Sequence, residues 1–156
     1  MIKITRFSFG GTAAVVTNMA LIIGLYAADA TQSAIVSSLL IVALADNLTD
    51  SLSIHIYQES ERLEPREAFR VTIANFFARL VISLMFVVFV LLFPIGVATV
   101  MSLLWGALLL ILISIAIARD RGVSPLSEIA KHTTAALVVV LASQAVGAWV
   151  PRLLHG

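Results

Sequence analysis

The sequence predicts an all-α, polytopic membrane protein with five transmembrane helices, for three reasons. Of its 156 residues, 60% are hydrophobic and only 12% are charged, which is more apolar surface than a soluble domain of this size can bury. Several apolar runs approach or exceed the ~20 residues with which a helix crosses a ~30 Å hydrocarbon core. The runs also lack the alternation of barrel strands, and lipid requires backbone amides to be satisfied internally. We expect residues 1–156 to form a single transmembrane domain.

Short polar breaks divide the apolar runs into five spans. The first span follows two basic residues and ends near Ala28-Asp29-Ala30, which has the form of a signal-peptide cleavage site, but we expect it to be retained. The second span is unusually polar, the third ends before Pro94, and the fourth ends before Arg119. Ser124-Pro125 predicts the start of an interfacial helix that leads into the fifth span. The predicted spans are 7–28, 33–57, 69–93, 97–118 and 132–150, and the breaks are 29–32, 59–67, 94–96 and 119–125.

Basic residues predict the orientation. With five spans, one side of the membrane holds Lys3, Arg6, Arg62, Arg66, Arg70, Arg119, Arg121 and Lys131. Only Arg152 falls on the other side, and Arg79 falls within a span. The positive-inside rule then places the N-terminus in the cytoplasm and the C-terminus outside. We expect an integral protein of the inner or plasma membrane of a prokaryote.

Polar residues form a stripe along the second span. Asp46, Asp50, Ser53 and Tyr57 share one helical face, and Asn47, Thr49 and Ser51 widen it. At ~1.5 Å per residue from a boundary near Tyr57, Asp50 lies ~10 Å and Asp46 ~16 Å deep. An ionised aspartate at the membrane centre costs ~2.5–3.5 kcal/mol. The pair should therefore meet a cation, a proton or a counter-ion.

The third span offers the counter-ion. Asn75 and Arg79 lie at the same predicted depths as Asp50 and Asp46, so we predict an Arg79–Asp46 ion pair that leaves Asp50 less neutralised. The alternative is a structural salt bridge between helices with hydrogen bonds around it. One arginine does not neutralise two aspartates, however, and acidic oxygen ligands favour a divalent cation such as Mn²⁺, Fe²⁺ or Mg²⁺.

An acidic segment follows the polar stripe. It holds Glu59, Glu61, Glu64 and Glu67, and His55 stands four residues before Glu59, close enough on a helix for both to meet one ion. One interpretation is a cation-concentrating entrance to the pathway. The other is a solvated hairpin whose glutamates pair with nearby arginines.

The chain resembles the vacuolar iron transporter family, whose members move ferrous and manganous ions out of the cytoplasm. The similarity runs through FSFGGTAAVVTNMALIIGL, IVALADNLTDSLSIHIYQESE, LLFP, RDRGVSPL and AVGAWV. It implies five helices, a cytoplasmic N-terminus and a homodimer.

The sequence departs from this family in three places. The family's first-helix acid is replaced by Gly10-Gly11-Thr12-Ala13-Ala14, and its second-helix pathway methionine corresponds to Asp50. The family's cytoplasmic metal-binding domain is reduced to the segment from Glu59 to Glu67.

We therefore expect a divalent-cation transporter of the Fe²⁺ and Mn²⁺ class, with proton coupling left open. The expected metal ligands are Asp46, Asp50, Asn47, His55, Glu59 and Glu61; the expected pathway or gating residues are Thr17, Asn18, Met19, Asn75 and Arg79. Alternatives are a non-transporting scaffold or accessory subunit of a larger membrane complex, and a small-molecule or proton transporter.

Other classes of function have little support. With no cysteine, thiolate metal sites and disulfides are excluded. No nucleophile–base pair or phosphate loop indicates an enzyme, and no basic-aromatic patch indicates nucleic-acid binding. We expect no tightly bound cofactor; the expected partners are the lipid bilayer, a second copy and, in the alternative, a larger membrane complex.

Overall fold

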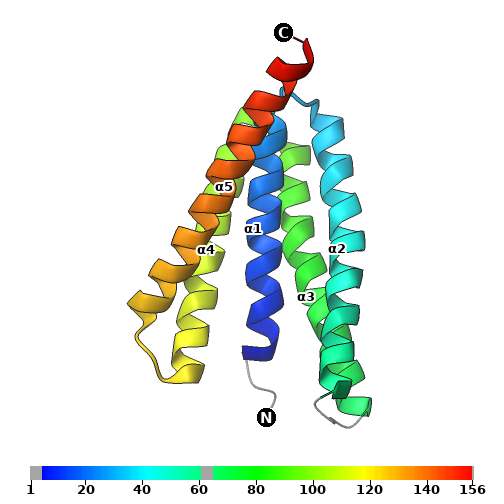
Figure 1. Cartoon of the computed structure of the whole chain (residues 1–156), viewed down its shortest axis with the longest axis vertical. Helices are drawn as coiled ribbons and strands as arrows, with labels where there is room; N and C mark the ends of the chain where they lie inside the picture. Colours follow the sequence, from blue (N-terminus) through cyan, green and yellow to red (C-terminus); the bar gives the residue numbers. More distant parts are fainter. Residues whose placement is uncertain (1–4, 61–64, 156) are drawn as a thin grey trace.

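The computed structural model describes residues 5–60 and 65–155, and these residues form five long helices joined by short connections (Figure 1). All five are long and apolar enough to cross a membrane. The all-α, five-span prediction is therefore confirmed. The helices are α1 (Thr5–Ala27), α2 (Gln32–Ser60), α3 (Pro65–Leu92), α4 (Ile95–Arg121) and α5 (Pro125–His155).

The helices run alternately up and down, so the two ends of the chain lie at opposite ends of the bundle (Figure 1). We call these the N-terminal end and the C-terminal end of the bundle. The N-terminal end holds the start of α1 and the connections α2–α3 and α4–α5. The C-terminal end holds the connections α1–α2 and α3–α4 and the end of α5.

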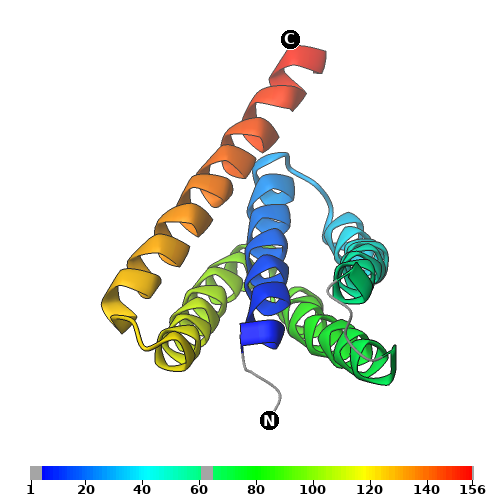
Figure 2. The same ribbon diagram turned by 60° about the horizontal axis from the view of Figure 1, so that its bottom comes forward.

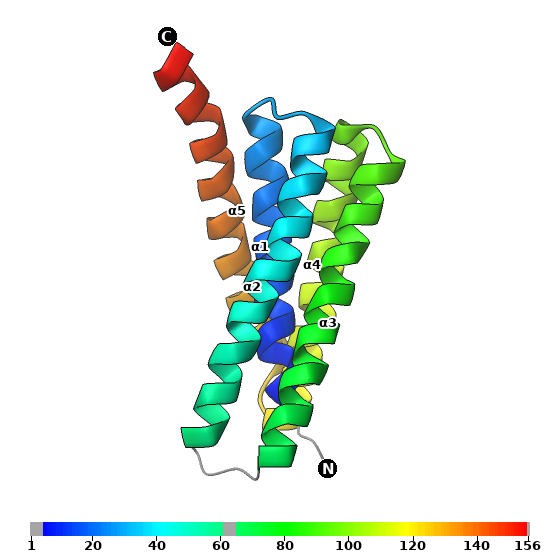
Figure 3. The same cartoon turned by 90° about the vertical axis from the view of Figure 1, so that its right-hand side faces the viewer.

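Helix α1 is the central element. It packs against each of the other four helices and separates the pair α4–α5 from the pair α2–α3 (Figure 2). Helices α2 and α3 lie side by side along most of their length (Figure 3). Because α2 packs mainly on α3, one flank of α2 is left uncovered by the chain.

Local sequence explains most helix boundaries. Pro94 precedes α4 and, with its fixed φ and no N–H group, cannot continue α3. Gly122 ends α4 at φ 64°, and its N–H donates to the carbonyls of Ala118 and Arg119. This is the left-handed cap that glycine favours. Helix α5 begins at Pro125, a favoured first helical position.

The fifth helix is longer than the predicted span at both ends. No break separates an interfacial segment from residues 132–150, because Glu128 in the first turn pairs with Lys131 and lets the charged turn stay helical. At the other end the helix continues through Pro151 to His155.

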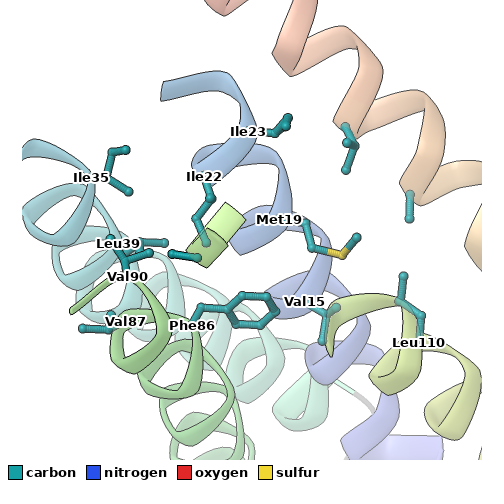
Figure 4. Packing of buried hydrophobic residues seen from close by; sticks show 13 residues of the cluster. Val15, Met19, Ile22, Ile23, Ile35, Leu39, Phe86, Val87, Val90 and Leu110 are labelled. Atoms are coloured by element: carbon teal, nitrogen blue, oxygen red, sulfur yellow. The ribbon is translucent and has the colours of Figure 1, made fainter. Parts of the chain in front are cut away.

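Along α1, α2 and α3 the apolar core occupies the C-terminal half of the bundle (Figure 4). Phe86 of α3 is fully buried between α1 and α2 residues, and Ile22 and Leu39 close the space towards the C-terminal end. Met19 and Leu110 extend the same cluster to α4. This end is held by dispersion contacts between close-packed side chains.

Two glycines permit close helix packing. A Cβ on Gly147 of α5 would collide with the carbonyl oxygen of Gly24 in α1, so the two backbones touch where these helices cross. A Cβ on Gly106 of α4 would collide with the sulfur of Met19. Small residues at such crossings let membrane helices approach closely without a hydrophobic driving force.

Candidate functional site

The acids of the second span lie beside Arg79 in the N-terminal half of the α2–α3 pair. Asp46 and Asp50 are one helical turn apart on α2 and so present their carboxylates to the same side. Asn47 is rotated by about 100° from Asp46 and points into the bundle, where it is 1% exposed. Arg79 comes from the facing turns of α3.

Arg79 binds all three of these α2 side chains. Its Nε donates to Asn47 Oδ1 at 2.9 Å, and its Nη2 donates to Asp46 Oδ2 at 2.9 Å. Its Nη1 donates to Asp50 Oδ2. The planar guanidinium thus spans two positions a turn apart on α2, a fork geometry that lysine cannot reproduce.

This arrangement confirms one prediction and corrects another. The predicted Arg79–Asp46 ion pair is present. The prediction that Asp50 would be less neutralised is wrong, because the second arm of the guanidinium contacts it. Both acids share one positive charge, so the cluster carries a net charge of −1 when all three groups are ionised.

Burial is unequal within the cluster. The Arg79 side chain is 1% exposed, whereas those of Asp46 and Asp50 are 41% and 39% exposed. The acids therefore lie on the uncovered flank of α2, with the arginine behind them. In a bilayer this flank meets acyl chains unless water, an ion or another chain covers it, and an intramembrane acid does not remain unpartnered there.

The neighbouring hydroxyl groups on this flank are satisfied within the helix. Thr49 Oγ1 donates to the carbonyl of Ala45 at 2.8 Å, and Ser53 Oγ donates to the carbonyl of Thr49 at 3.0 Å. Their protons are thus committed to the backbone, while their oxygen lone pairs still face outward. Asp46, Asp50, Thr49 and Ser53 together make this flank a surface of oxygen acceptors.

On the inner side of Arg79 lies a layer of buried amides and hydroxyls. Asn75 is 0% exposed, and within the described residues neither its Oδ1 nor its Nδ2 has a hydrogen-bond partner. Asn47 Nδ2 and Ser51 Oγ are also buried without a hydrogen-bond partner among the described residues. Buried polar atoms of this kind are rare and call for a functional or solvent partner.

The first-helix candidates point in different directions. Asn18 lies beside α3, where its Nδ2 donates to Ser83 Oγ at 3.0 Å and to the Ala14 carbonyl at 2.7 Å. Met19 faces α4 and belongs to the apolar core instead of the polar layer (Figure 4). Thr17 is half-buried on α1. Asn18 thus hydrogen-bonds the α3 face that carries Arg79.

The structure does not gather the predicted metal ligands at one point. His55 faces α3, with its Nδ1 3.4 Å from Thr72 Oγ1. Across residues 5–60 and 65–155, no three histidine or acidic side chains come close enough to hold a metal ion. Glu61 and the side chain of Glu59 lie outside the described residues. Asp46, Asp50 and Asn47 are therefore the only predicted ligands that the described structure brings together.

Two features were not found by sequence reasoning. Gly10 was recognised only as a missing acid, but a Cβ there would collide with Asn75 Oδ1 and lie 3.1 Å from Arg79 Cδ. Adjacent glycines inside a helical run are the signal that predicts such a close approach.

The second feature is Glu128, which is 4% exposed and pairs with Lys131 at 3.0 Å and with Arg121 at 3.8 Å. Its signal was an acid in a first helical turn with a lysine three residues later.

No family model, curated protein or solved structure matches this chain. The resemblance to vacuolar iron transporters thus remains an expectation based on the motifs. The acid–arginine cluster is therefore the feature from which a function can be inferred.

Proposed function

We propose that this chain is a membrane transporter of divalent metal cations of the Fe²⁺ and Mn²⁺ class, with Asp46 and Asp50 as ligands within the membrane. The observation that carries the proposal is one buried guanidinium held by two half-exposed carboxylates. This cluster retains a negative charge on the side that faces away from the arginine. A cation approaching that side meets two carboxylates and two hydroxyl oxygens.

Hard oxygen ligands support this class of substrate. Carboxylate and carbonyl oxygens suit Mn²⁺ and other hard divalent ions better than soft ligands do. Two carboxylates do not complete a coordination shell, so the proposal includes a second copy of the chain, whose α2 flank faces the first.

The distribution of basic residues supports the direction of transport. Among the described residues, Arg66, Arg70, Arg119, Arg121 and Lys131 lie at the N-terminal end of the bundle, and Arg152 lies at the other. The positive-inside rule places the N-terminal end in the cytoplasm. The acids lie in that half of the bundle, where cations from the cytoplasm would reach them first, as export requires.

The test is Mn²⁺ flux in proteoliposomes that contain the full chain, with Asp50→Asn as the variant. Asparagine keeps the shape and still accepts a bond from Arg79, but it removes the excess negative charge. We expect flux to fall by at least about tenfold, the change that ~1.4 kcal/mol of lost cation stabilisation produces.

The matched control is Asp29→Asn, an exposed acid in the α1–α2 connection with φ 55°, a conformation that asparagine tolerates. Flux in this variant should equal that of the wild type. Wild-type flux no greater than that of empty liposomes, or full flux in Asp50→Asn, would overturn the proposal.

A second candidate is a non-transporting subunit of a larger membrane complex. The observation that favours it is that Arg79 already engages both acids, while the described residues hold no three-ligand metal group. In that case a partner helix covers the acidic flank in place of a cation. Co-purification of a stoichiometric partner, together with no Mn²⁺ flux, would support this candidate.

A further inference from the structure

Arg79 has polar surroundings on both sides, and only one side is used. Its guanidinium carries five N–H donors, of which three bond to the α2 side chains Asp46, Asn47 and Asp50. Behind it, towards α1, stands Asn75, whose Oδ1 accepts no hydrogen bond from the described residues. An amide oxygen buried beside an arginine is a natural acceptor for that arginine.

Helix geometry places Asn75 within reach of the guanidinium. Asn75 and Arg79 are four residues apart on α3 and therefore neighbours on one face. A long helical side chain also lies over the turn that precedes its own Cα, which for Arg79 is the turn of Asn75. Consistent with this, Asn75 Oδ1 and Arg79 Cδ both lie against Gly10 of α1.

Cation binding makes this acceptor necessary. The inference rests on the proposed function: when a divalent cation takes the two carboxylates, repulsion from the cation pushes the guanidinium away from them. A guanidinium that is 1% exposed cannot turn to water, and a buried charge without partners is strongly destabilising. It must find another acceptor inside the bundle.

We propose that Asn75 is a positioning residue that accepts the Arg79 guanidinium when a cation occupies Asp46 and Asp50. Asn75 acts through Arg79 and does not touch the cation. Its amide oxygen sets how readily the arginine leaves the acids, and therefore how tightly the acids hold a cation. Gly10 provides the space, because any side chain there would occupy the position of the Asn75 oxygen.

Two substitutions at this position are expected to act in opposite directions. Asn75→Leu removes the acceptor at similar volume, so Arg79 stays on the acids and the Kd for Mn²⁺ rises by about tenfold, the effect of one hydrogen bond to a charged group. Asn75→Asp places a carboxylate oxygen where the amide oxygen was and draws Arg79 away. Its Kd for Mn²⁺ falls by a similar factor.

A second measurement needs no metal. Dicyclohexylcarbodiimide modifies carboxyl groups that are accessible from the membrane, and peptide mass spectrometry locates the modified residue. In the full-length protein in nanodiscs, labelling of Asp46 and Asp50 should increase in Asn75→Asp and decrease in Asn75→Leu. Ser83→Ala is the matched control, because Ser83 lies one turn to the other side of Arg79 and bonds Asn18.

The outcomes separate this inference from the proposed function. If the wild type binds no Mn²⁺, the proposed function fails, and the labelling still decides whether Asn75 controls Arg79. A purely structural role for Asn75 predicts that both substitutions change binding and labelling in the same direction, as general loosening would. That result, or values equal to those of Ser83→Ala, would overturn the inference, and if Asn75→Leu does not fold, Asn75→Asp alone decides.

Discussion

Replacing Arg79 with leucine should destabilise the contact between α2 and α3. The side chain is 1% exposed and holds two carboxylates and the amide oxygen of Asn47. Removing one partner of a buried ion pair costs about 3–5 kcal/mol, because the remaining charge is left without compensation. Here the remaining acids are 41% and 39% exposed and can take up protons or water. We therefore expect the lower end of the range, about 3 kcal/mol.

The assay is thermal unfolding of the purified protein in detergent. For a chain of this length, ~1 kcal/mol shifts the midpoint by about 2–4 °C, so the expected loss is about 6–12 °C. The control is Arg70→Leu, which removes an exposed arginine from the same helix. A surface substitution of this kind changes stability by no more than about 0.5 kcal/mol.

A triple variant separates charge compensation from packing. Arg79→Leu combined with Asp46→Asn and Asp50→Asn removes all three charges together. Replacing a whole buried ion cluster with neutral groups is often neutral in stability, so the triple variant should recover most of the loss. If it is as unstable as Arg79→Leu alone, or if Arg79→Leu matches Arg70→Leu, the charge argument is wrong.

Two further predictions concern packing. Gly147→Ala should lower the free energy of unfolding by about 1–3 kcal/mol in the same assay, because the new methyl group meets the rigid carbonyl of Gly24. The control, Ala145→Val on the exposed face of α5, should have no effect. Equal losses in both variants would contradict the close contact of α1 and α5 at Gly147. Phe86→Ala should lower the unfolding midpoint clearly more than Phe77→Ala, since Phe86 is 0% exposed within the core and Phe77 is 56% exposed; similar shifts for both would place the core elsewhere.

The helices could be predicted from the sequence because lipid leaves few alternatives. Each span must satisfy its own backbone, so length and hydropathy are sufficient to find it. The errors lie at the ends, where charge pairs decide. The helix start predicted at Ser124-Pro125 is confirmed, but it is continuous with the predicted span 132–150 and not a separate interfacial segment, because Glu128 and Lys131 neutralise each other on one helical face. A hydropathy pattern counts these two charges separately and therefore begins the span too late.

The candidate site could be predicted only in part. Matching depths across two helices found the Arg79–Asp46 pair, because depth depends on helical rise alone. The contact with Asp50 was missed, since matching depths treats each side chain as a point, whereas the forked guanidinium bonds two side chains that start one turn apart. The first helix shows a second limit. Thr17, Asn18 and Met19 are consecutive, so they point about 100° apart, and the sequence does not say which neighbour each one meets.

The division of the bundle into an apolar half and a polar half determines how it can move. At the C-terminal end, separating α2 from α3 would break the close-packed contacts of the buried apolar core. At the N-terminal end, entering water can bond the buried polar atoms of Asn47, Ser51 and Asn75 that have no partner among the described residues, so water compensates for parting the helices there. We therefore expect α2 and α3 to separate at the N-terminal end of the bundle while their C-terminal ends stay packed. A route to the opposite face of the membrane then requires a second movement that separates the helices at the apolar core.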